Sequence, residues 1–286
     1  MSELRFLVFD AYPQSGRDAL TAAGGTEAGT LYRRLLERLE PGAAVDVAFP
    51  ADGPPATPNG VALEDYDGWV WTGSSLTIWH DDDPAVRTQI DLARHGYEVG
   101  MQQFGSCWAA QLAATAAGGE VGQNPRGREF GFAREIELNS AGQAHPMFEG
   151  KSHVFDGFTC HADIVTGLPE SATLLASNEF TPIQALAVDH VSGSFWAIQY
   201  HPEYDLREIA ALARLRREEL IEQGSFGTRW EVRSWVEAAE TLEDAEDRED
   251  LKDVLGARAS VLEPGPRTLE VRNWIDHAVK PRRADR

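Results

Sequence analysis

Apolar residues in the first half of the chain form short continuous runs that alternate with segments of helical periodicity. The runs predict buried strands over residues 4–9, 43–50, 68–71 and 96–104. The periodic segments predict helices over residues 31–39, 84–95 and 107–117. After the first strand, Pro13 and Gly16 indicate a turn. Strands that alternate with helices in this way favour a parallel α/β sheet.

The pattern changes in the second half of the chain. Shorter strand-like pieces follow one another between residues 130 and 158, and the last strong strand signal covers residues 195–200. Residues 206–222 predict a helix with four apolar residues on one side. These are Ile209, Leu212, Leu215 and Leu220. We therefore expect an α/β domain over residues 1–205 and a helical, acidic extension over residues 206–286, packed on that domain.

The composition is strongly acidic. Among 286 residues, 46 Asp and Glu oppose 26 Lys and Arg, which gives a formal net charge of −20. This charge argues against a nucleic-acid partner, because binding to a phosphate backbone depends on cationic side chains. Nine of the carboxylates lie between residues 237 and 253. Such a stretch is typical of a solvated helix face, and docking of a partner is the alternative.

Cysteine content and hydropathy indicate the compartment. The two cysteines, Cys107 and Cys160, are too few for a disulfide framework and fit a reducing environment. The N-terminus lacks the apolar core and cleavage site of a signal peptide. No apolar run approaches the roughly 20 residues that a membrane helix needs. We expect a soluble, cytoplasmic protein that does not bind membranes.

Cys107 stands between a predicted strand and a predicted helix, the position of a nucleophile elbow. A tight turn there needs small neighbours, which Gly105 and Ala109 supply. The N–H groups at the start of the helix would stabilise a thiolate. The alternative is that Cys107 is only a buried apolar residue.

His201-Pro202-Glu203 follows the last predicted strand. An imidazole can take a proton from a thiol and return it to a leaving amine, while a carboxylate orients the ring. The alternative is a strand that simply ends there before the next helix.

Together, these two segments resemble the class I glutamine amidotransferases, in which a Gly-x-Cys-x-Gly-x-Gln elbow precedes a strand that ends in His-Pro-Glu. The chain has Gly-Ser-Cys-Trp-Ala-Ala-Gln at residues 105–111 and His-Pro-Glu at residues 201–203. The resemblance covers roughly residues 4–205, and the chain is similar to the glutaminase domain of GMP synthetase. Other segments match in order, at residues 67–74, 118–119, 124–131 and 160–163.

The resemblance implies a catalytic triad. Cys107 would attack the side-chain amide carbon of glutamine, His201 would act as general base and then acid, and Glu203 would orient His201. The oxyanion would be held by backbone N–H groups at the elbow and in an upstream loop, namely Trp108, Ser74 and the preceding Gly73. Substrate binding is implied for the side chain of Gln111 and for the backbone of Ala162 and Asp163.

This sequence departs from the family pattern at three places. The second elbow glycine is Ala109, the common Gly-His-Gln reads Ala109-Ala110-Gln111, and the oxyanion loop reads Gly73-Ser74-Ser75 without Gly-Gly-Pro. Alanine is small enough for a tight turn, so the assignment of Cys107 as the nucleophile is unaffected. The departures bear on the shape of the pocket, and therefore on which γ-glutamyl compound it accepts.

The implied fold is a three-layer, flavodoxin-like α/β domain with a mostly parallel sheet and the site at its carboxyl edge. The implied reaction is hydrolysis of L-glutamine through a cysteinyl γ-glutamyl thioester. Its ammonia would pass to a separate synthetase subunit, because the chain carries no nucleotide-binding motif. The alternatives are a stand-alone γ-glutamyl peptide or amide hydrolase with the same triad, and a silent regulatory or docking protein. No cofactor is expected, and the histidine spacing indicates no metal site.

Overall fold

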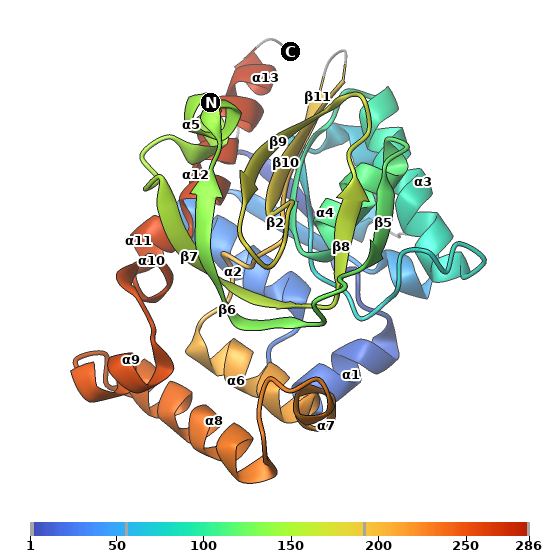
Figure 1. Cartoon of the computed structure of the whole chain (residues 1–286). Coiled ribbons are helices and arrows are strands. Elements are labelled where there is room, and N and C mark those ends of the chain that lie inside the picture. Colours follow the sequence, from blue (N-terminus) through green and yellow to red (C-terminus); the bar gives the residue numbers. More distant parts are fainter. Residues whose placement is uncertain (1–2, 55–56, 191–192, 285–286) are drawn as a thin grey trace.

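The computed structural model describes residues 3–54, 57–190 and 193–284, and a nine-stranded mixed sheet lies at its centre (Figure 1). Five parallel strands form one half, in the order β2 Ala44–Ala48, β1 Arg5–Phe9, β3 Gly68–Trp71, β4 Gln102–Ser106 and β11 Gly193–Ile198. Antiparallel strands continue it, in the order β10 Ala185–His190, β9 Ala172–Ser177, β6 Glu129–Leu138 and β7 Val154–His161. A separate antiparallel pair is formed by β5 Glu120–Gln123 and β8 Asp163–Gly167.

Helices cover both faces of the parallel half. Residues of α2, Ala28–Leu39, pack with Phe6 and Val8 of β1 on one face. Leu7 and Phe9 pack on the opposite face with α3, Pro84–Glu98, and α4, Trp108–Ala116. β1 and β3 are buried on both faces and almost entirely apolar, which explains their continuous apolar runs, whereas the buried strand β4 also carries Gln102 and Gln103. The order β2-β1-β3-β4-β11 is that of a flavodoxin-like sheet, so the expected fold class is confirmed, with a mixed sheet.

The turn expected around Pro13 and Gly16 is wrong, because α1 occupies Gln14–Ala22. Only Arg17 and Leu20 of this helix are buried, so the sequence shows no apolar periodicity there. Pro13 is the N-cap residue of α1. Proline is tolerated at the start of a helix because a backbone N–H there would have no partner within the helix.

The strand expected from residue 96 also begins too early. α3 continues to Glu98, and the chain turns at Gly100, whose φ is 65°. Gly96 lies inside the helix because the side chain of Gln103 packs against it. A Cβ on Gly96 would lie 2.4 Å from Gln103 Nε2. This glycine therefore marks close packing rather than the end of a helix.

The described residues after 205 form helices joined by short turns, and their division from the α/β part as a separate domain stays a prediction. The helix expected over residues 206–222 is two helices that meet at Arg216. The helices are α6 Leu206–Leu215, α7 Arg217–Glu222, α8 Arg229–Asp244, α9 Glu249–Leu255, α10 Ala259–Leu262, α11 Pro264–Arg267, α12 Leu269–Trp274 and α13 Lys280–Ala284, with a π-helical segment Ile275–Val279 between the last two. The remaining short elements are α5 Ser140–Ala144 and 3-10 turns at Pro50–Asp52, Pro58–Gly60, Leu63–Asp65 and Pro146–Phe148.

The acidic stretch lies on α8, α9 and the turn between them. Seven of its nine carboxylates are exposed, and Glu240 and Glu243 are half-buried. Glu240 pairs with Arg214 of α6, and Glu243 accepts a hydrogen bond from the N–H of Leu206. The half-buried carboxylates thus tie α8 to α6, while the exposed ones face solvent. None of the described helices is long and apolar enough to cross a membrane.

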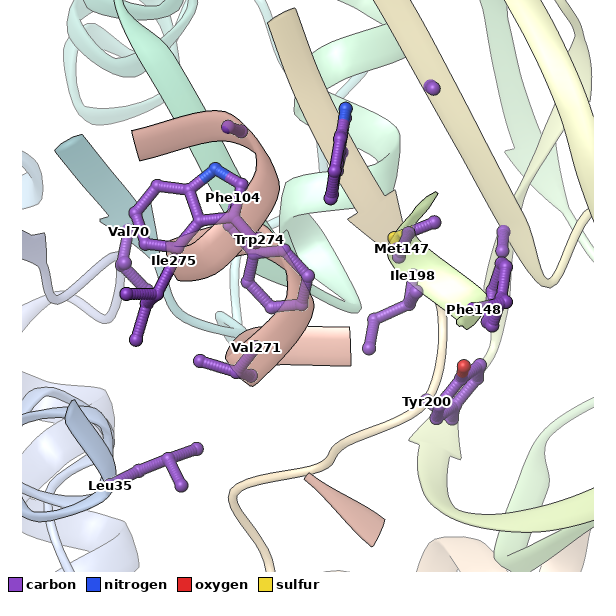
Figure 2. Close-up of a cluster of buried hydrophobic side chains, with 14 of the residues drawn as sticks. Leu35, Val70, Phe104, Met147, Phe148, Ile198, Tyr200, Val271, Trp274 and Ile275 are labelled. Carbon is purple, nitrogen blue, oxygen red and sulfur yellow. The ribbon is translucent and has the colours of Figure 1, made fainter. Parts of the chain in front are cut away.

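Trp274 of α12 is fully buried against the sheet (Figure 2). Its indole lies with its centroid 5.8 Å from the rings of Phe6 and Phe104. A Cβ on Gly68 would lie 2.7 Å from this indole, so the glycine makes room for it. The end of the chain therefore contributes to the main core.

Replacing Trp274 with alanine is expected to lower the free energy of unfolding by about 3–5 kcal/mol, because it leaves a large cavity under the sheet. Urea denaturation measures this loss. Trp230, which is 73% exposed, provides the matched control, since Trp230→Ala should change the value by no more than about 0.5 kcal/mol. Equal effects for the two variants would contradict a core role for α12.

Candidate active site

The sharp turn at Cys107 joins β4 to α4. Its backbone has φ 55° and ψ −98°, a strained conformation for a residue other than glycine. Its N–H donates to the carbonyl of Ile198 at 2.8 Å, which fixes the turn to the end of β11. A Cβ on Gly105 would lie 2.4 Å from Trp71 O and 2.5 Å from the Cβ of Ala109. The turn therefore needs glycine at 105 and a small residue at 109.

His201 and Glu203 lie beside this turn, just beyond the end of β11. Their contact is a 2.7 Å hydrogen bond between Nδ1 of His201 and Oε1 of Glu203, and both side chains are buried. Ser106 Oγ donates to the same carboxylate oxygen at 2.8 Å. The imidazole stacks on Tyr204 with centroids 3.9 Å apart, and the N–H of His201 donates to Phe158 O at 2.8 Å. Ring orientation is thus set from several directions.

Opposing effects act on the protonation of His201. Burial lowers the pKa of its imidazole, but the Glu203 carboxylate and a side-chain hydrogen bond with Cys107 outweigh it and raise the pKa to about 10. The imidazole of His201 is therefore in its cationic form, with both ring nitrogens protonated, at neutral pH. An imidazolium between a thiol and a carboxylate can deliver that proton to a leaving amine.

The loop after β3 lies over Cys107 and His201. A Cβ on Gly73 would lie 3.0 Å from Cε1 of His201 and 3.8 Å from the Cβ of Cys107. The Ser74 hydroxyl fixes the loop, because it donates to Ala11 O at 2.8 Å and accepts from the N–H of Leu76. Within the described part of the chain, the backbone N–H groups of Ser74 and Trp108 have no hydrogen-bond partner. Both are therefore available to an external acceptor.

Gly73→Ala is expected to reduce kcat by roughly 10- to 100-fold, because its methyl group would displace the His201 ring, a change of about 1–3 kcal/mol. The φ of Gly73 lies outside the left-handed region, so the backbone itself accepts alanine. Steady-state kinetics and a thermal melt separate activity from folding. Gly265→Ala, where a Cβ meets nothing within 4 Å, should leave both unchanged. Unchanged kcat in Gly73→Ala would show that the loop does not approach the reacting atoms.

A cavity of about 210 Å³ opens in front of Cys107. The side chain of Gln111 crosses its floor and donates to Asp163 O at 3.1 Å. The Nδ1 atom of His161 lies 3.1 Å from the same oxygen, and the N–H of Asn124 donates to Ala162 O at 2.8 Å. The backbone at residues 162 and 163 is thus held rigidly at the cavity wall. A larger hollow of about 1010 Å³ beyond Arg128 contains none of the residues predicted for the site.

Three side chains at or behind this cavity, Arg128, Glu129 and Arg216, were not expected to take part in the site. Glu129 is buried, and its pKa, which burial raises, is lowered overall by hydrogen bonds from His161 and two amides. Glu129 and His161, like Arg128, lie inside segments that match the family, so those segments carried a signal. Nothing in the sequence indicated a functional role for Arg216, because it falls within a predicted helix. It reaches the cavity only because that helix is interrupted.

The family model for "Glutamine amidotransferase class-I" matches residues 81–214, which include Cys107, His201 and Glu203. The chain belongs to the class I glutamine amidotransferase family and is a hydrolase of that family. A γ-glutamyl-L-1-hydroxyisopropylamide hydrolase of Pseudomonas sp. is 34% identical over 98% of this chain and 95% of its own length.

Other relatives match part of the chain. The γ-glutamyl peptidase 3 of Arabidopsis thaliana is 31% identical over 50% of this chain and 57% of its own length. A GMP synthase of Methylobacillus flagellatus is 31% identical over 48% of this chain and 25% of its own length. The crystal structure of a glutamine amidotransferase from Thermotoga maritima superposes with a TM-score of 0.65 and 20% identity, covering 96% of this chain and 99% of that one. At this sequence identity, the similarity to the Thermotoga structure shows that the two proteins share a fold.

Proposed function

We propose that the protein hydrolyses γ-glutamyl amides whose amide nitrogen carries a small organic substituent. The observation that carries this proposal is the similarity to the Pseudomonas γ-glutamyl amide hydrolase, which extends through the C-terminal helices. The Arabidopsis γ-glutamyl peptidase supports the same substrate class. From the sequence we expected glutamine hydrolysis coupled to a synthetase. That expectation has less support, because the GMP synthase match covers only a quarter of the synthase.

In the proposed reaction, the Cys107 thiolate attacks the γ-carbonyl carbon of the substrate. The backbone N–H groups of Trp108 and Ser74 stabilise the oxyanion that forms. His201, held by Glu203, donates its proton to the departing amine, and a γ-glutamyl thioester remains on Cys107. Water then attacks the thioester while His201 takes up its proton. The products are L-glutamate and the free amine, and the thiolate–imidazolium pair is restored.

A comparison of three substrates tests the proposal. Purified protein is incubated with γ-glutamylisopropylamide, L-glutamine or a γ-glutamyl dipeptide, and the released amine is measured by mass spectrometry. We expect the substituted amide to have a kcat/KM at least about tenfold above that of glutamine, a difference of 1.4 kcal/mol. A preference for glutamine would support the ammonia-donor function instead. Absence of turnover with all three would support a silent docking protein.

A further inference from the structure

The two oxygens of the Glu203 carboxylate are bound unequally. Oε1 accepts from Nδ1 of His201 at 2.7 Å and from Oγ of Ser106 at 2.8 Å. Oε2 is buried and has no hydrogen-bond partner among the described residues. A carboxylate that leaves water keeps its charge only where protein donors replace the hydrogen bonds that it loses. The group that orients His201 therefore lacks a donor on one side.

Tyr32 carries an unused donor on the neighbouring helix α2. One turn earlier, the N–H of Gly29 donates to Oδ2 of Asp10 at 2.8 Å, which fixes the start of this helix at the carboxyl end of β1. Residues three positions apart share a helix face, so the side chain of Tyr32 also points toward this end of the sheet. Tyr32 is fully buried, and its hydroxyl has no hydrogen-bond partner in the described part of the chain.

The hydroxyl of Tyr32 faces the Glu203 carboxylate and the Ser106 hydroxyl. Burial raises the pKa of the Tyr32 hydroxyl well above its usual value, and the charge of Glu203 raises it further. Both Ser106 and Glu203 are near enough to act on the same pKa through side-chain hydrogen bonding. The hydroxyl therefore keeps its proton at neutral pH. A buried donor and a buried acceptor, each without a partner in this structure, lie within reach of each other.

We propose that Tyr32 and Ser106 are positioning residues for Glu203, with Ser106 holding Oε1 and the Tyr32 hydroxyl donating to Oε2 during turnover. This inference rests on the catalytic triad of the proposed function and adds two residues to it. The second donor is needed when the His201 imidazolium gives its Nε2 proton to the departing amine. Glu203 then loses the positive charge beside it and keeps its own charge in a buried place. Donation from Tyr32 stabilises the carboxylate at this point, so the other proton stays on Nδ1 of His201.

A purely structural role for Tyr32 predicts a different result. The ring would then only fill space between α2 and the sheet, and its unpaired hydroxyl would cost free energy. Tyr32→Phe keeps the ring and removes the hydroxyl. A structural role therefore predicts a variant that is as stable as wild type or more stable, with unchanged activity. A positioning role predicts a loss of activity and a shift in its pH dependence.

The direction of the pH shift follows from the donors. Hydroxyl donors favour the ionised carboxylate, so they lower the pH at which Glu203 takes up a proton. The carboxylate interacts with the titratable side chains of His201, Tyr32 and Tyr204, and Cys107 interacts with His201. Burial keeps both tyrosines protonated, while the histidine and the cysteine are present in every variant. Loss of one donor should therefore move the acid limb of reactivity upward by about 0.5–1 pH unit.

Alkylation of Cys107 by iodoacetamide tests the proposal without an amide substrate. Its rate reports the thiolate, which the His201 imidazolium and hence the ionised Glu203 stabilise. Peptide mass spectrometry follows the labelled residue in wild type, Tyr32→Phe, Ser106→Ala and the double variant over a range of about pH 4 to 9. We expect the acid limb to shift upward in each single variant and further in the double variant.

Kinetics with γ-glutamylisopropylamide are measured in parallel. Each single variant should lower kcat by roughly 3- to 10-fold and leave KM unchanged, because the two hydroxyls act on Glu203 rather than on the substrate. Tyr66→Phe is the matched control. Tyr66 is also fully buried, and its hydroxyl donates to Oδ2 of Asp46 at 2.8 Å, a carboxylate outside the site. This variant should lower the melting temperature without changing kcat or the alkylation profile.

Unchanged kcat and an unshifted alkylation profile in Tyr32→Phe would overturn the proposal, whatever the melting temperature. A raised KM with unchanged kcat would also overturn it, because it would assign Tyr32 to substrate binding. If the alkylation profiles shift as expected but no amide is hydrolysed, the proposed function fails while the positioning role of Tyr32 and Ser106 holds. Hydrolysis of the amide with unshifted profiles would have the opposite meaning.

Discussion

Cys107→Ala is expected to lower kcat for any γ-glutamyl amide by about 10⁴-fold or more, because no other group can form the thioester. The fold should persist, since alanine is small and the turn is fixed by the bond from residue 107 N–H to Ile198 O. The strained φ of 55° disfavours alanine and cysteine alike. Amine release and a thermal melt give the two measurements.

Covalent labelling makes the same prediction sharper. A γ-glutamyl diazoketone, 6-diazo-5-oxo-L-norleucine, should add one equivalent to wild type and none to Cys107→Ala, as read by intact mass. Cys160 lines the same cavity and is half-buried, so Cys160→Ser is the matched control and should still be labelled. Labelling that persists in Cys107→Ala and disappears in Cys160→Ser would show that Cys160 is the nucleophile.

The catalytic residues of this site could be predicted because each of them is marked by a short segment of sequence. Cys107 directly follows β4, and His201 lies three residues beyond the end of β11. These two strands are parallel neighbours, so their carboxyl ends lie side by side. The sequence therefore predicts their proximity once the strands are recognised. Glu203 follows because it is two residues from His201. The family resemblance adds the loop at Gly73, which no periodicity would have connected with Cys107.

Arg216 and Trp274 show why the rest could not be predicted. Both lie in segments whose local pattern predicts only helix. Arg216 reaches the cavity because one helix is interrupted there, and Trp274 reaches the core because Gly68, some two hundred positions earlier, leaves room for its indole. Contacts over such sequence separations depend on the packing of the whole chain. A single sequence carries no pattern that reports them.

Glu203→Gln is expected to reduce kcat by roughly 10²- to 10⁴-fold with little change in fold, because a glutamine amide no longer favours the proton on Nδ1 of His201. The carboxylate is buried and accepts from His201 and Ser106 through one oxygen. A neutral amide of the same shape can keep one of these contacts and loses the charge. Comparing kcat and the melting temperature of the variant with those of wild type separates catalysis from folding.

The raised pKa of His201 also predicts how the free energy of unfolding depends on pH. The folded-state pKa of His201, about 10, lies above its ordinary value of 6.5. The stability that this proton contributes is therefore fully present below about pH 6.5 and is lost as the pH rises through about 10. Glu203 is the largest of the groups that raise this pKa, so Glu203→Gln should remove most of that contribution.

The difference in the free energy of unfolding between wild type and Glu203→Gln should accordingly narrow as the pH rises from about 7 to about 10. Denaturant titrations of both proteins across this range measure it, and groups that titrate alike in wild type and variant cancel in the difference. A difference that stays constant or widens would mean that Glu203 does not hold the proton on His201. The role of Glu203 would then be limited to packing, and the imidazolium that the proposed mechanism needs would require another source.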